Sequence, residues 1–255
     1  MKPLLTASAV SKKFGGLNAL SNVSFSVNRG EIYGIIGPNG AGKTTLFNAL
    51  TGLYIPDTGD IRLADHRLHG RKPHQILQAG LARTFQNIRL FANMSALENV
   101  MVGRHARMKA GVLGAVLRTP AVRREEADTA LRAHVLLKRV GIQRHSQVLA
   151  KNLSYGDQRR LEIARALASN PLLLALDEPA AGMNPVEKSA LRELLLGLRN
   201  EDGLTLMLIE HDVKLVMSTC DRVLVLDHGE KLVEDTPANV RADPRVIAAY
   251  LGKAA

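Results

Sequence analysis

The chain has 255 residues, 46% of them hydrophobic and 23% charged, and this composition excludes wholesale disorder. Its 34 Lys and Arg against 24 Asp and Glu give a net charge of +10, which favours polyanionic partners: nucleotides, nucleic acid or anionic lipid headgroups. The single cysteine, Cys220, excludes a disulfide framework and a cysteine-based zinc site within the chain, and it fits a reducing compartment.

The amino-terminal part of the chain predicts short strands that lead to a loop and a helix. Alternating apolar residues predict strands over 5–10 and 23–27. An apolar strand over 31–36 runs directly into a glycine-rich loop, and a helix follows from Lys43 to about Thr51. Residues 61–64 predict a further strand.

The rest of the chain has a helical block and then alternating strands and helices. From about residue 87 to residue 152, Leu, Ala, Arg and Glu recur at helical spacing, with one long amphipathic helix over 121–140. Helices are predicted over 158–169 and 185–200, buried strands over 172–176 and 204–209, and a hairpin over 223–234. This alternation predicts an α/β fold with a parallel sheet, into which the helical block is inserted.

Membrane-spanning and secreted proteins have patterns that this sequence lacks. A spanning helix needs about 20 mostly apolar residues, and the apolar run 110–117 is short and bracketed by Lys109 and Arg118. The amino terminus has no secretory signal pattern, because Lys12 and Lys13 stand where a cleavage site would lie. We therefore expect a soluble, cytosolic protein.

The glycine-rich loop fits the pattern G-x-x-x-x-G-K-[ST] of a phosphate-binding loop between a strand and a helix. Glycines let the backbone wrap around phosphate, so that N–H groups and the positive helix end face the anion. Lys43 reaches the β- and γ-phosphates, and Thr44 offers a hydroxyl to Mg²⁺. The candidate nucleotide-binding residues here are Gly37, Pro38, Asn39, Gly40, Ala41, Gly42, Lys43, Thr44 and Thr45.

Two adjacent carboxylates follow the apolar strand Leu172–Leu176. Neighbouring residues on a strand point to opposite sides, so Asp177 and Glu178 are predicted to have different roles. We assign Asp177 to Mg²⁺ and Glu178 to the polarisation of an attacking water, a general-base role that contributes roughly 10²–10⁴-fold in rate. A strand cap that ends at Pro179 is the alternative interpretation, which the phosphate loop in the same chain disfavours.

Further segments resemble those of ATP-binding-cassette (ABC) ATPases, and they occur in the order typical of that family. Phe14 is similar to the aromatic that stacks on adenine, Gln86 to the Q-loop glutamine, and His211 to the switch histidine. The two remaining segments, which resemble the LSGGQ signature and the D-loop, are Leu153-Ser154-Tyr155-Gly156-Asp157-Gln158 and Ala180-Ala181-Gly182-Met183-Asn184. The resemblance covers essentially the whole chain.

This resemblance implies a P-loop NTPase (RecA-like) fold. Residues 1–86 and 159–255 would form a core with a mixed sheet and an antiparallel β subdomain. Residues 87–158 would form an inserted helical subdomain that carries the signature segment. The whole chain would be a single ABC ATPase domain that hydrolyses ATP.

The resemblance also implies roles for individual residues, with ATP and Mg²⁺ as ligands. The catalytic residues would be Glu178, His211, Gln86 and Lys43, and Mg²⁺ would be held by Thr44, Gln86 and Asp177. Ser154 and the N–H groups at Gly156, at a helix start, would form a second anion site for the γ-phosphate of ATP on a second ATPase subunit. ATP would then close a dimer, and hydrolysis would open it.

Within the family, the chain resembles the ATPases of branched-chain amino-acid importers, of the LivG type. The segments that carry this resemblance are 83–91, 159–165, 178–185, 209–217 and 249–252, with the helical segment 103–124. The resemblance implies integral-membrane permease subunits, a periplasmic or extracellular binding protein, and a place on the inner face of the cell membrane. Three residues depart from the usual motifs: Tyr155, Asp157 (where glutamine is usual) and Asn184 (where aspartate is usual).

Three other functions compete with this one. An ATPase of another ABC branch, such as lipopolysaccharide export, shares much of the motif set, but segment 103–124 and Tyr155 favour the amino-acid branch. A cassette ATPase that acts on nucleic acid or ribosomes is disfavoured because the sequence has one cassette, no long coiled-coil insertion and no tandem second site. A module that binds nucleotide without turnover is disfavoured because Lys43, Glu178 and His211 are all present.

Some residues are interpreted as structural. His66, His69 and His74 lack the spacing of metal ligands and are predicted to lie in a solvated loop. Cys220 is predicted to pack in a helical segment. The basic residues between Arg104 and Arg124 are interpreted as a face for a permease or anionic headgroups, not for nucleic acid.

Overall fold

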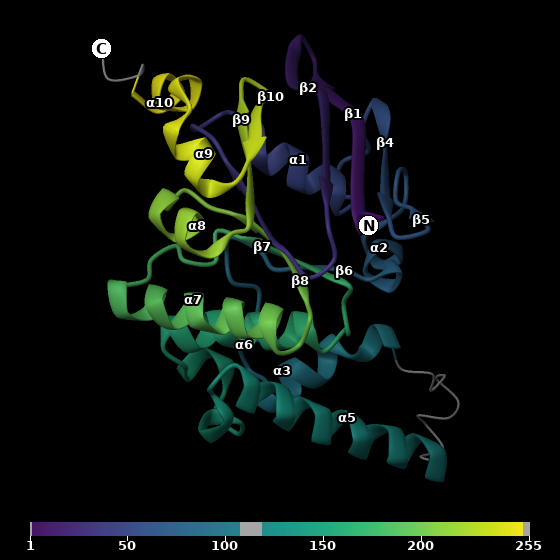
Figure 1. The fold of residues 1–255 in the computed structure, drawn as a ribbon. Coiled ribbons are helices and arrows are strands. Elements are labelled where there is room, and N and C mark those ends of the chain that lie inside the picture. Colours follow the sequence, from purple (N-terminus) through teal and green to yellow (C-terminus); the bar gives the residue numbers. More distant parts are fainter. Residues whose placement is uncertain (1, 108–118, 252–255) are drawn as a thin grey trace. The chain divides into compact units, whose positions relative to one another are not determined.

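The computed structural model describes residues 2–107 and 119–251, and these form two compact units (Figure 1). The first unit contains the described residues up to Arg83 and from Leu172 onward, and the second is Thr84–Pro171. Both sheets belong to the first unit, and the described part of the second unit is built from helices. No helix in these described ranges is both long and apolar enough to cross a membrane.

A six-stranded sheet is the centre of the first unit, in the order β10-β9-β3-β8-β7-β6. The neighbours from β9 to β6 are parallel, and β10 pairs with β9 as an antiparallel hairpin. All residues of β3, β7 and β8 are buried, as expected for central parallel strands covered on both faces. The strands are β3 (Ile32–Ile36), β6 (Leu81–Arg83), β7 (Leu173–Asp177), β8 (Thr205–Ile209), β9 (Arg222–Asp227) and β10 (Glu230–Asp235).

The second sheet of this unit has four antiparallel strands in the order β2-β1-β4-β5. These are β1 (Leu5–Phe14), β2 (Leu17–Val27), β4 (Thr58–Leu63) and β5 (His66–Arg67). One hydrophobic cluster joins the two sheets and α1 (Lys43–Leu50), with Val10 and Val27 from one sheet, Ile35 and Met207 from the other, and Phe47 from the helix. The mixed sheet and the antiparallel sheet confirm the predicted fold class.

Two helices of the first unit, α7 (Pro185–Asn200) and α8 (Val213–Thr219), begin at polar residues whose side chains cap them. Asn184 caps α7 in a capping box with Glu187, and Asp212 caps α8. The other helices are α2 (Pro73–Ala79), α9 (Pro237–Ala242) and α10 (Pro244–Leu251). Figure 1 shows α9 and α10, in yellow, beside β9 and β10, against which they pack.

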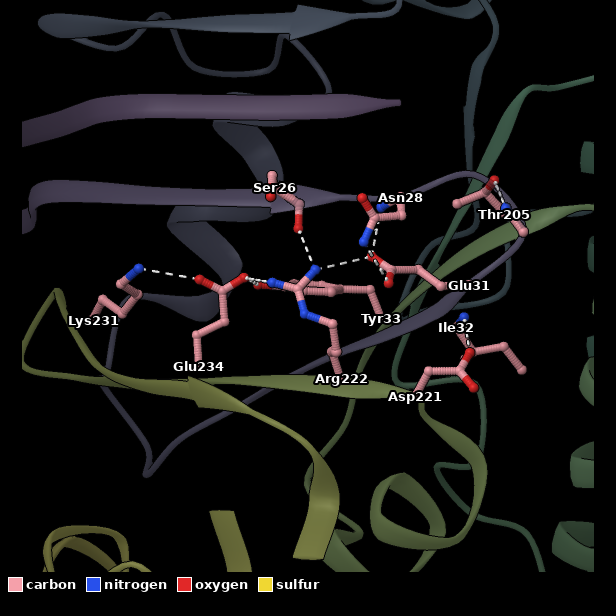
Figure 2. A network of polar contacts seen from close by, with 11 residues as sticks. Ser26, Asn28, Glu31, Ile32, Tyr33, Thr205, Asp221, Arg222, Lys231 and Glu234 are labelled. Atoms are coloured by element: carbon pink, nitrogen blue, oxygen red, sulfur yellow. Dashed lines mark hydrogen bonds and ion pairs between the residues drawn. The ribbon is translucent and has the colours of Figure 1, made fainter. Parts of the chain in front are cut away.

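A network of polar side chains lies at the amino end of the parallel strands (Figure 2). Arg222 donates to Glu31 Oε1 at 3.3 Å and to Glu234 Oε1, and its guanidinium lies 5.4 Å from the centre of the Tyr33 ring. The Tyr33 hydroxyl donates to the same Glu234 oxygen at 2.8 Å, and burial raises the pKa of this tyrosine. Glu31 also accepts the backbone N–H of Asn28 at 2.6 Å. Buried carboxylates at this end therefore have partners within the protein.

The second unit is a packed group of helices. Its main helices are α3 (Ala96–Gly103), α5 (Pro120–Arg139) and α6 (Tyr155–Leu167), with short 3₁₀ turns η1 (His105–Arg107), η2 (Gln143–His145) and η3 (Ala150–Asn152). A Cβ at Gly103 would lie 2.1 Å from the Arg165 carbonyl oxygen, so glycine is needed where α3 crosses α6. Ser95 caps α3 in a capping box with Glu98, and Thr119 caps α5.

Several element predictions differ from the structure. Strands β1 and β2 are longer than the predicted ranges 5–10 and 23–27, and β6, α2, α9 and α10 were not predicted. The second unit ends at Pro171, whereas the predicted helical subdomain ends at 158, inside the continuous helix α6. Residues 108–118 of the family-typical segment 103–124, and Gly252 of 249–252, lie outside the described residues.

Candidate functional site

The phosphate loop lies where the sequence predicts it, between the buried strand β3 and helix α1. Gly42 has φ of 95°, and a Cβ there would lie 2.6 Å from the Ala19 carbonyl oxygen, so this position requires glycine. The same holds at Gly37, where a Cβ would lie 2.2 Å from the Leu226 carbonyl oxygen. Helix α1 has no side-chain cap, which leaves its positive end to face an anion.

Lys43 is folded back over this loop. Its ammonium donates to the carbonyl oxygens of Gly37 at 2.7 Å and Pro38 at 3.0 Å. Burial lowers the pKa of Lys43, and the nearby Glu178 carboxylate opposes that shift. The structure thus brings the loop lysine and the predicted general base to one end of the sheet. Thr44 is exposed at the helix start, beside Thr45.

Glu178 and His211 form a direct pair. Glu178 Oε1 lies 2.7 Å from His211 Nε2, and the backbone N–H of Glu178 donates to the Ile209 carbonyl at 2.8 Å. The Glu178 side chain is 14% exposed and that of His211 46%, so the pair reaches solvent through the histidine. The sequence therefore identified two residues that the tertiary structure places in contact.

The structure corrects the argument by which the sequence analysis separated the roles of Asp177 and Glu178. Asp177 is the last residue of β7, but Glu178 lies beyond the strand with φ of 46°. Strand alternation does not apply to a residue in this left-handed conformation, which costs an ordinary residue about 1–2 kcal/mol. The turn at Glu178, not the pleat of the strand, gives the two carboxylates different neighbours.

Asp177 is held by an arginine from the neighbouring strand. Arg83, at the end of β6, donates from Nη2 to Asp177 Oδ2 at 2.8 Å and from Nη1 to Asn48 Oδ1 and Thr51 Oγ1, at 2.7 and 2.9 Å. Its guanidinium lies 4.5 Å from the centre of the Phe47 ring. The sequence analysis assigned no role to Arg83 itself. No signal in the sequence pointed to it, because the three-residue strand β6 was not predicted and only the folded sheet places its end beside that of β7.

Glu210 is a buried acid that the sequence analysis did not single out. It follows β8 directly, is 3% exposed, and accepts the backbone N–H of Ala180 at 2.7 Å and that of His211 at 3.2 Å. Burial raises the pKa of its carboxyl, and hydrogen bonds from Ala180, Asp212 and His211 oppose the rise. No local pattern in the sequence marks Glu210, because it is one of 24 acidic residues and only the fold buries it.

Phe14 ends β1 with a partly exposed ring. The ring is 43% exposed and packs edge-on against Tyr54, with ring centres 5.2 Å apart. The Lys12 ammonium lies 5.6 Å from the ring centre. Tyr54 is an aromatic neighbour of Phe14 that the sequence analysis missed.

In the second unit, Ser154 is the capping residue of α6. Its hydroxyl accepts the Asp157 N–H at 3.2 Å, and Gly156 lies in the first turn of this helix. Asp157 Oδ2 lies 3.3 Å from His145 Nδ1, which offers the carboxylate a partner inside this unit. Ser154 and Gly156 therefore lie at a helix start, as predicted.

A buried ion pair holds the backbone beside Gln86. Arg159, on the buried face of α6, donates to the carbonyl oxygens of Phe85 at 2.8 Å and Gln86, and lies 3.2 Å from Glu162 Oε2. Glu162 accepts the Phe85 N–H at 3.2 Å, and burial raises its pKa. Arg159 also donates to the Tyr155 hydroxyl at 3.2 Å. The sequence analysis assigned no role to Arg159 or Glu162 in positioning Gln86.

The histidines and the cysteine that the sequence analysis interpreted as structural all lie in the first unit. Within residues 2–107 and 119–251 no three His, Cys, Asp or Glu side chains are grouped to hold a metal. His66 lies in β5 and His74 in α2, so the predicted solvated loop holds His69 alone. Cys220 is buried, and burial raises the pKa of its thiol, which agrees with a packing role.

The predicted Mg²⁺ ligands have a suitable chemistry. Thr44 and Asp177 both belong to the first unit and offer a hydroxyl and a carboxylate, which are oxygen donors of the kind that Mg²⁺ prefers. Mg²⁺ usually takes only one or two carboxylates and completes its shell with phosphate oxygens and water. Gln86, the third predicted ligand, belongs to the second unit.

Comparisons with known proteins find relatives that match this chain along nearly its whole length. The family model described as ABC transporter matches residues 20–181, and that described as Branched-chain amino acid ATP-binding cassette transporter matches 230–255. The chain is 48% identical to the high-affinity branched-chain amino acid transport ATP-binding protein LivG of Salmonella typhimurium, over 99% of both chains. It is 34% identical to the lipopolysaccharide export system ATP-binding protein LptB of Haemophilus influenzae, over 98% of both.

Solved structures show the same fold. The ADP conformation of MJ1267, an ATP-binding cassette of an ABC transporter, matches with a TM-score of 0.86 and 31% identity, over 99% of this chain and all of that one. The dimeric structure of MJ0796, a bacterial ABC transporter cassette, matches with a TM-score of 0.77 and 26% identity, over 91% of this chain and 98% of that one.

Proposed function

The chain belongs to the ABC transporter family, and on that premise we propose that it is the ATP-hydrolysing subunit of an importer of branched-chain amino acids. The observation that carries the proposal is the 48% identity to LivG over 99% of both chains. The match of residues 230–255 to the branched-chain amino-acid family model supports the same substrate class.

The residues at the carboxyl end of the sheet fit ATP hydrolysis. The N–H groups of the loop and of the first turn of α1 would hold the phosphates, and Lys43 would turn from the loop carbonyls to the β- and γ-phosphates. Glu178 would take a proton from the water that attacks the γ-phosphorus, and ADP would leave with the electrons of the broken bond. His211, 2.7 Å from Glu178, would fix that carboxylate and donate to the γ-phosphate.

The remaining predicted residues complete the nucleotide site. When bound, Mg²⁺ would neutralise charge on the phosphates, held by Thr44, Asp177 and Gln86. Phe14 would stack on the adenine from its exposed face.

Two ATPase subunits would work together. Ser154 and the N–H groups at Gly156 lie at the positive start of α6, where an anion is favoured. We assign to them the γ-phosphate of ATP held by a second subunit, either a copy of this chain or a sibling. The dimeric MJ0796 cassette supports this arrangement. Hydrolysis would then remove the charge that bridges the subunits, and the dimer would open.

Other subunits would carry the substrate. We place the ATPase on the inner face of the cell membrane, bound to integral-membrane permeases, with a periplasmic or extracellular binding protein that delivers the amino acid. The described chain has no membrane-spanning helix of its own, so the permeases would form the path. The lower identity to LptB, 34% against 48%, makes lipopolysaccharide export the weaker candidate.

Uptake and co-purification test the transport function. Deletion of the gene is expected to abolish high-affinity leucine uptake, and the native protein is expected to co-purify with permease subunits. Complementation with the parent sequence should restore uptake, and complementation with the Lys43→Ala variant should not. Intact leucine uptake together with a defect in lipopolysaccharide export would instead support the LptB-like function.

The role of Glu178 has its own test. Glu178→Gln removes the proton acceptor but keeps the shape of the side chain, so we expect ATP to bind and turnover to fall about 10²–10⁴-fold. The ATP-loaded variant should accumulate as a closed dimer, measured by size-exclusion chromatography with light scattering. Hydrolysis at the parental rate would show that Glu178 is not the general base.

A further inference from the structure

Glu210 is the first residue of the loop after β8, and its side chain reaches the loop after β7. The loop after β7 carries Glu178, and the loop after β8 carries His211. Glu210 Oε1 accepts the N–H of Ala180 in the first loop at 2.7 Å, and Oε2 accepts the N–H of His211 in the second at 3.2 Å. One side chain therefore connects both loops through its two oxygens.

The backbone of Glu210 adds a connection to the strand before the phosphate loop. Its N–H donates to the Ile35 carbonyl at 3.4 Å, and Ile35 lies two residues before Gly37. The residue is 3% exposed, so water does not compete strongly for these bonds. Glu210, directly after β8, thus bonds to Ile35 in β3 and to Ala180 in the loop after β7.

The chemistry of these contacts favours an ionised carboxylate. The two hydrogen bonds that its side chain accepts come from backbone N–H groups, those of Ala180 and His211. A carboxylate offers acceptors on both oxygens, whereas an amide offers an acceptor on one atom and donors on the other. Glutamine at this position would place an NH₂ group against an N–H of one of the two loops.

The loop after β7, to which Glu210 bonds, contains the strained residue of the site. Glu178 has φ of 46°, a conformation that an ordinary residue keeps only when its surroundings hold it. The Ala181 N–H donates back to the Glu178 carbonyl at 3.1 Å, and Ala180, inside that turn, is the residue that Glu210 anchors. The anchor therefore acts on the backbone that aims the Glu178 side chain.

We propose that Glu210 is a positioning residue for ATP hydrolysis, which joins the Glu178 loop to the His211 loop so that the 2.7 Å pair between them is preformed. The proposal rests on the proposed ATPase function. Glu210 does not contact the nucleotide in this role. Its removal should lower kcat and leave the affinity for ATP unchanged.

The test compares Glu210→Gln with a matched control at the other end of the same sheet. Glu31 is also a buried glutamate that accepts a backbone N–H, at 2.6 Å from Asn28, but it precedes β3 (Figure 2). Glu210→Gln is expected to lower kcat about 10- to 100-fold with KM for ATP within about twofold. Glu31→Gln is expected to lower the melting temperature while kcat stays within about twofold of the parent.

A double variant distinguishes positioning from general damage. If Glu210 acts through Glu178, adding Glu210→Gln to Glu178→Gln should change single-turnover hydrolysis by less than about twofold, because residues that act as a unit are not additive. A full further loss in the double variant would overturn the proposal. So would a Glu210→Gln variant with parental kcat, or one whose kcat and ATP affinity fall together.

Two further measurements keep the test decisive. If circular dichroism shows that Glu210→Gln does not fold, Glu210→Asp takes its place, because aspartate keeps both acceptor oxygens on a shorter side chain. A lower kcat of Glu210→Asp at unchanged KM would support the proposal. A parental kcat of this variant would overturn it. Absence of ATP hydrolysis by the parent chain would contradict the proposed function itself. Hydrolysis by the parent chain that Lys43→Ala abolishes, with no effect of Glu210→Gln, would contradict only the positioning role.

Discussion

The two ends of the six-stranded sheet hold their buried charges in different ways. At the amino end, Arg222 lies between Glu31 and Glu234 and against the Tyr33 ring, so that these charges satisfy one another (Figure 2). At the carboxyl end, the Glu178–His211 pair is 46% exposed at the histidine, and its carboxylate lies in a left-handed turn. The amino end is thus a network of charges paired with one another. The carboxyl end has partly exposed groups that are available to a charged ligand.

The comparison shows how one sheet separates stability from chemistry. The carboxyl ends of parallel strands all lie at one edge of the sheet, and so do the loops that follow them. Strain and partly exposed charge are concentrated at that edge, where a ligand can offset them. Beside the charged network of the amino edge, the left-handed conformation falls on Gly30, which tolerates it.

The largest effect is expected from the carboxyl end. Lys43→Ala removes the ammonium that lies over the phosphate loop, so ATP turnover should fall by at least about 100-fold. Stability should change little or rise, because burial of this charge is unfavourable, as the lowered pKa of Lys43 indicates. Turnover is measured by phosphate release and stability by urea unfolding. Turnover of the Lys43→Ala variant at the parental rate would show that the two ends of the sheet do not differ in function as proposed.

An intermediate effect is expected from a change at the amino end, and this change should lower stability rather than turnover. Arg222→Met leaves the carboxylates of Glu31 and Glu234 without their cation, and we expect a loss of about 2–4 kcal/mol in the free energy of unfolding. The side chain of Arg222 is 29% exposed, which keeps this figure below the range for a fully buried pair. Turnover per folded molecule should stay within about twofold of the parent. A selective loss of turnover would show that the amino end also takes part in the chemistry.

The smallest expected effect is a pH dependence of stability that arises from Asp212, near the carboxyl end of the sheet. The Lys188 ammonium, 2.6 Å from Asp212, lowers the pKa of that carboxyl, and Asp212 also caps α8. Because the folded pKa is below the ordinary value of about 3.9, this stabilisation is present at neutral pH and is lost as the pH falls through the folded pKa.

The test compares the parent with Asp212→Asn. The variant keeps a capping oxygen but not the charge, so it should be less stable at pH 7 by at most about 1 kcal/mol, since Lys188 is 36% exposed. The difference between the two proteins in urea unfolding should shrink as the pH falls through the folded pKa of Asp212. A difference that stays constant from pH 7 down through the acid range would mean that the charge of Asp212 does not contribute.

Patterns confined to one segment were predictable from the sequence. The phosphate loop follows a spacing that any chain must use to wrap a backbone around phosphate, and its strand and helix lie where predicted. The buried strands β7 and β8, the long helix α5 and the hairpin of β9 and β10 also have strong local signals: apolar runs, helical periodicity and the His228-Gly229 turn.

Short elements and positioning residues were not predictable in the same way. Strand β6 has three residues, and α9 has six, and both are stabilised by neighbours distant in sequence rather than by their own propensity. Arg83 and Glu210 are ordinary charged residues until the sheet places them beside Asp177 and Ala180. Their partners lie 94 and 30 residues away, and no periodic pattern encodes such a distance.

The sequence by itself thus determined the groups that we propose for the chemistry: Lys43, Asp177, Glu178 and His211, each within a recognisable local motif. The tertiary structure alone decided how those groups are held, by the left-handed turn at Glu178 and by the buried partners Arg83 and Glu210. The physical reason is that chemical identity resides in single side chains, whereas orientation depends on burial and on hydrogen bonds between strands that only folding brings together.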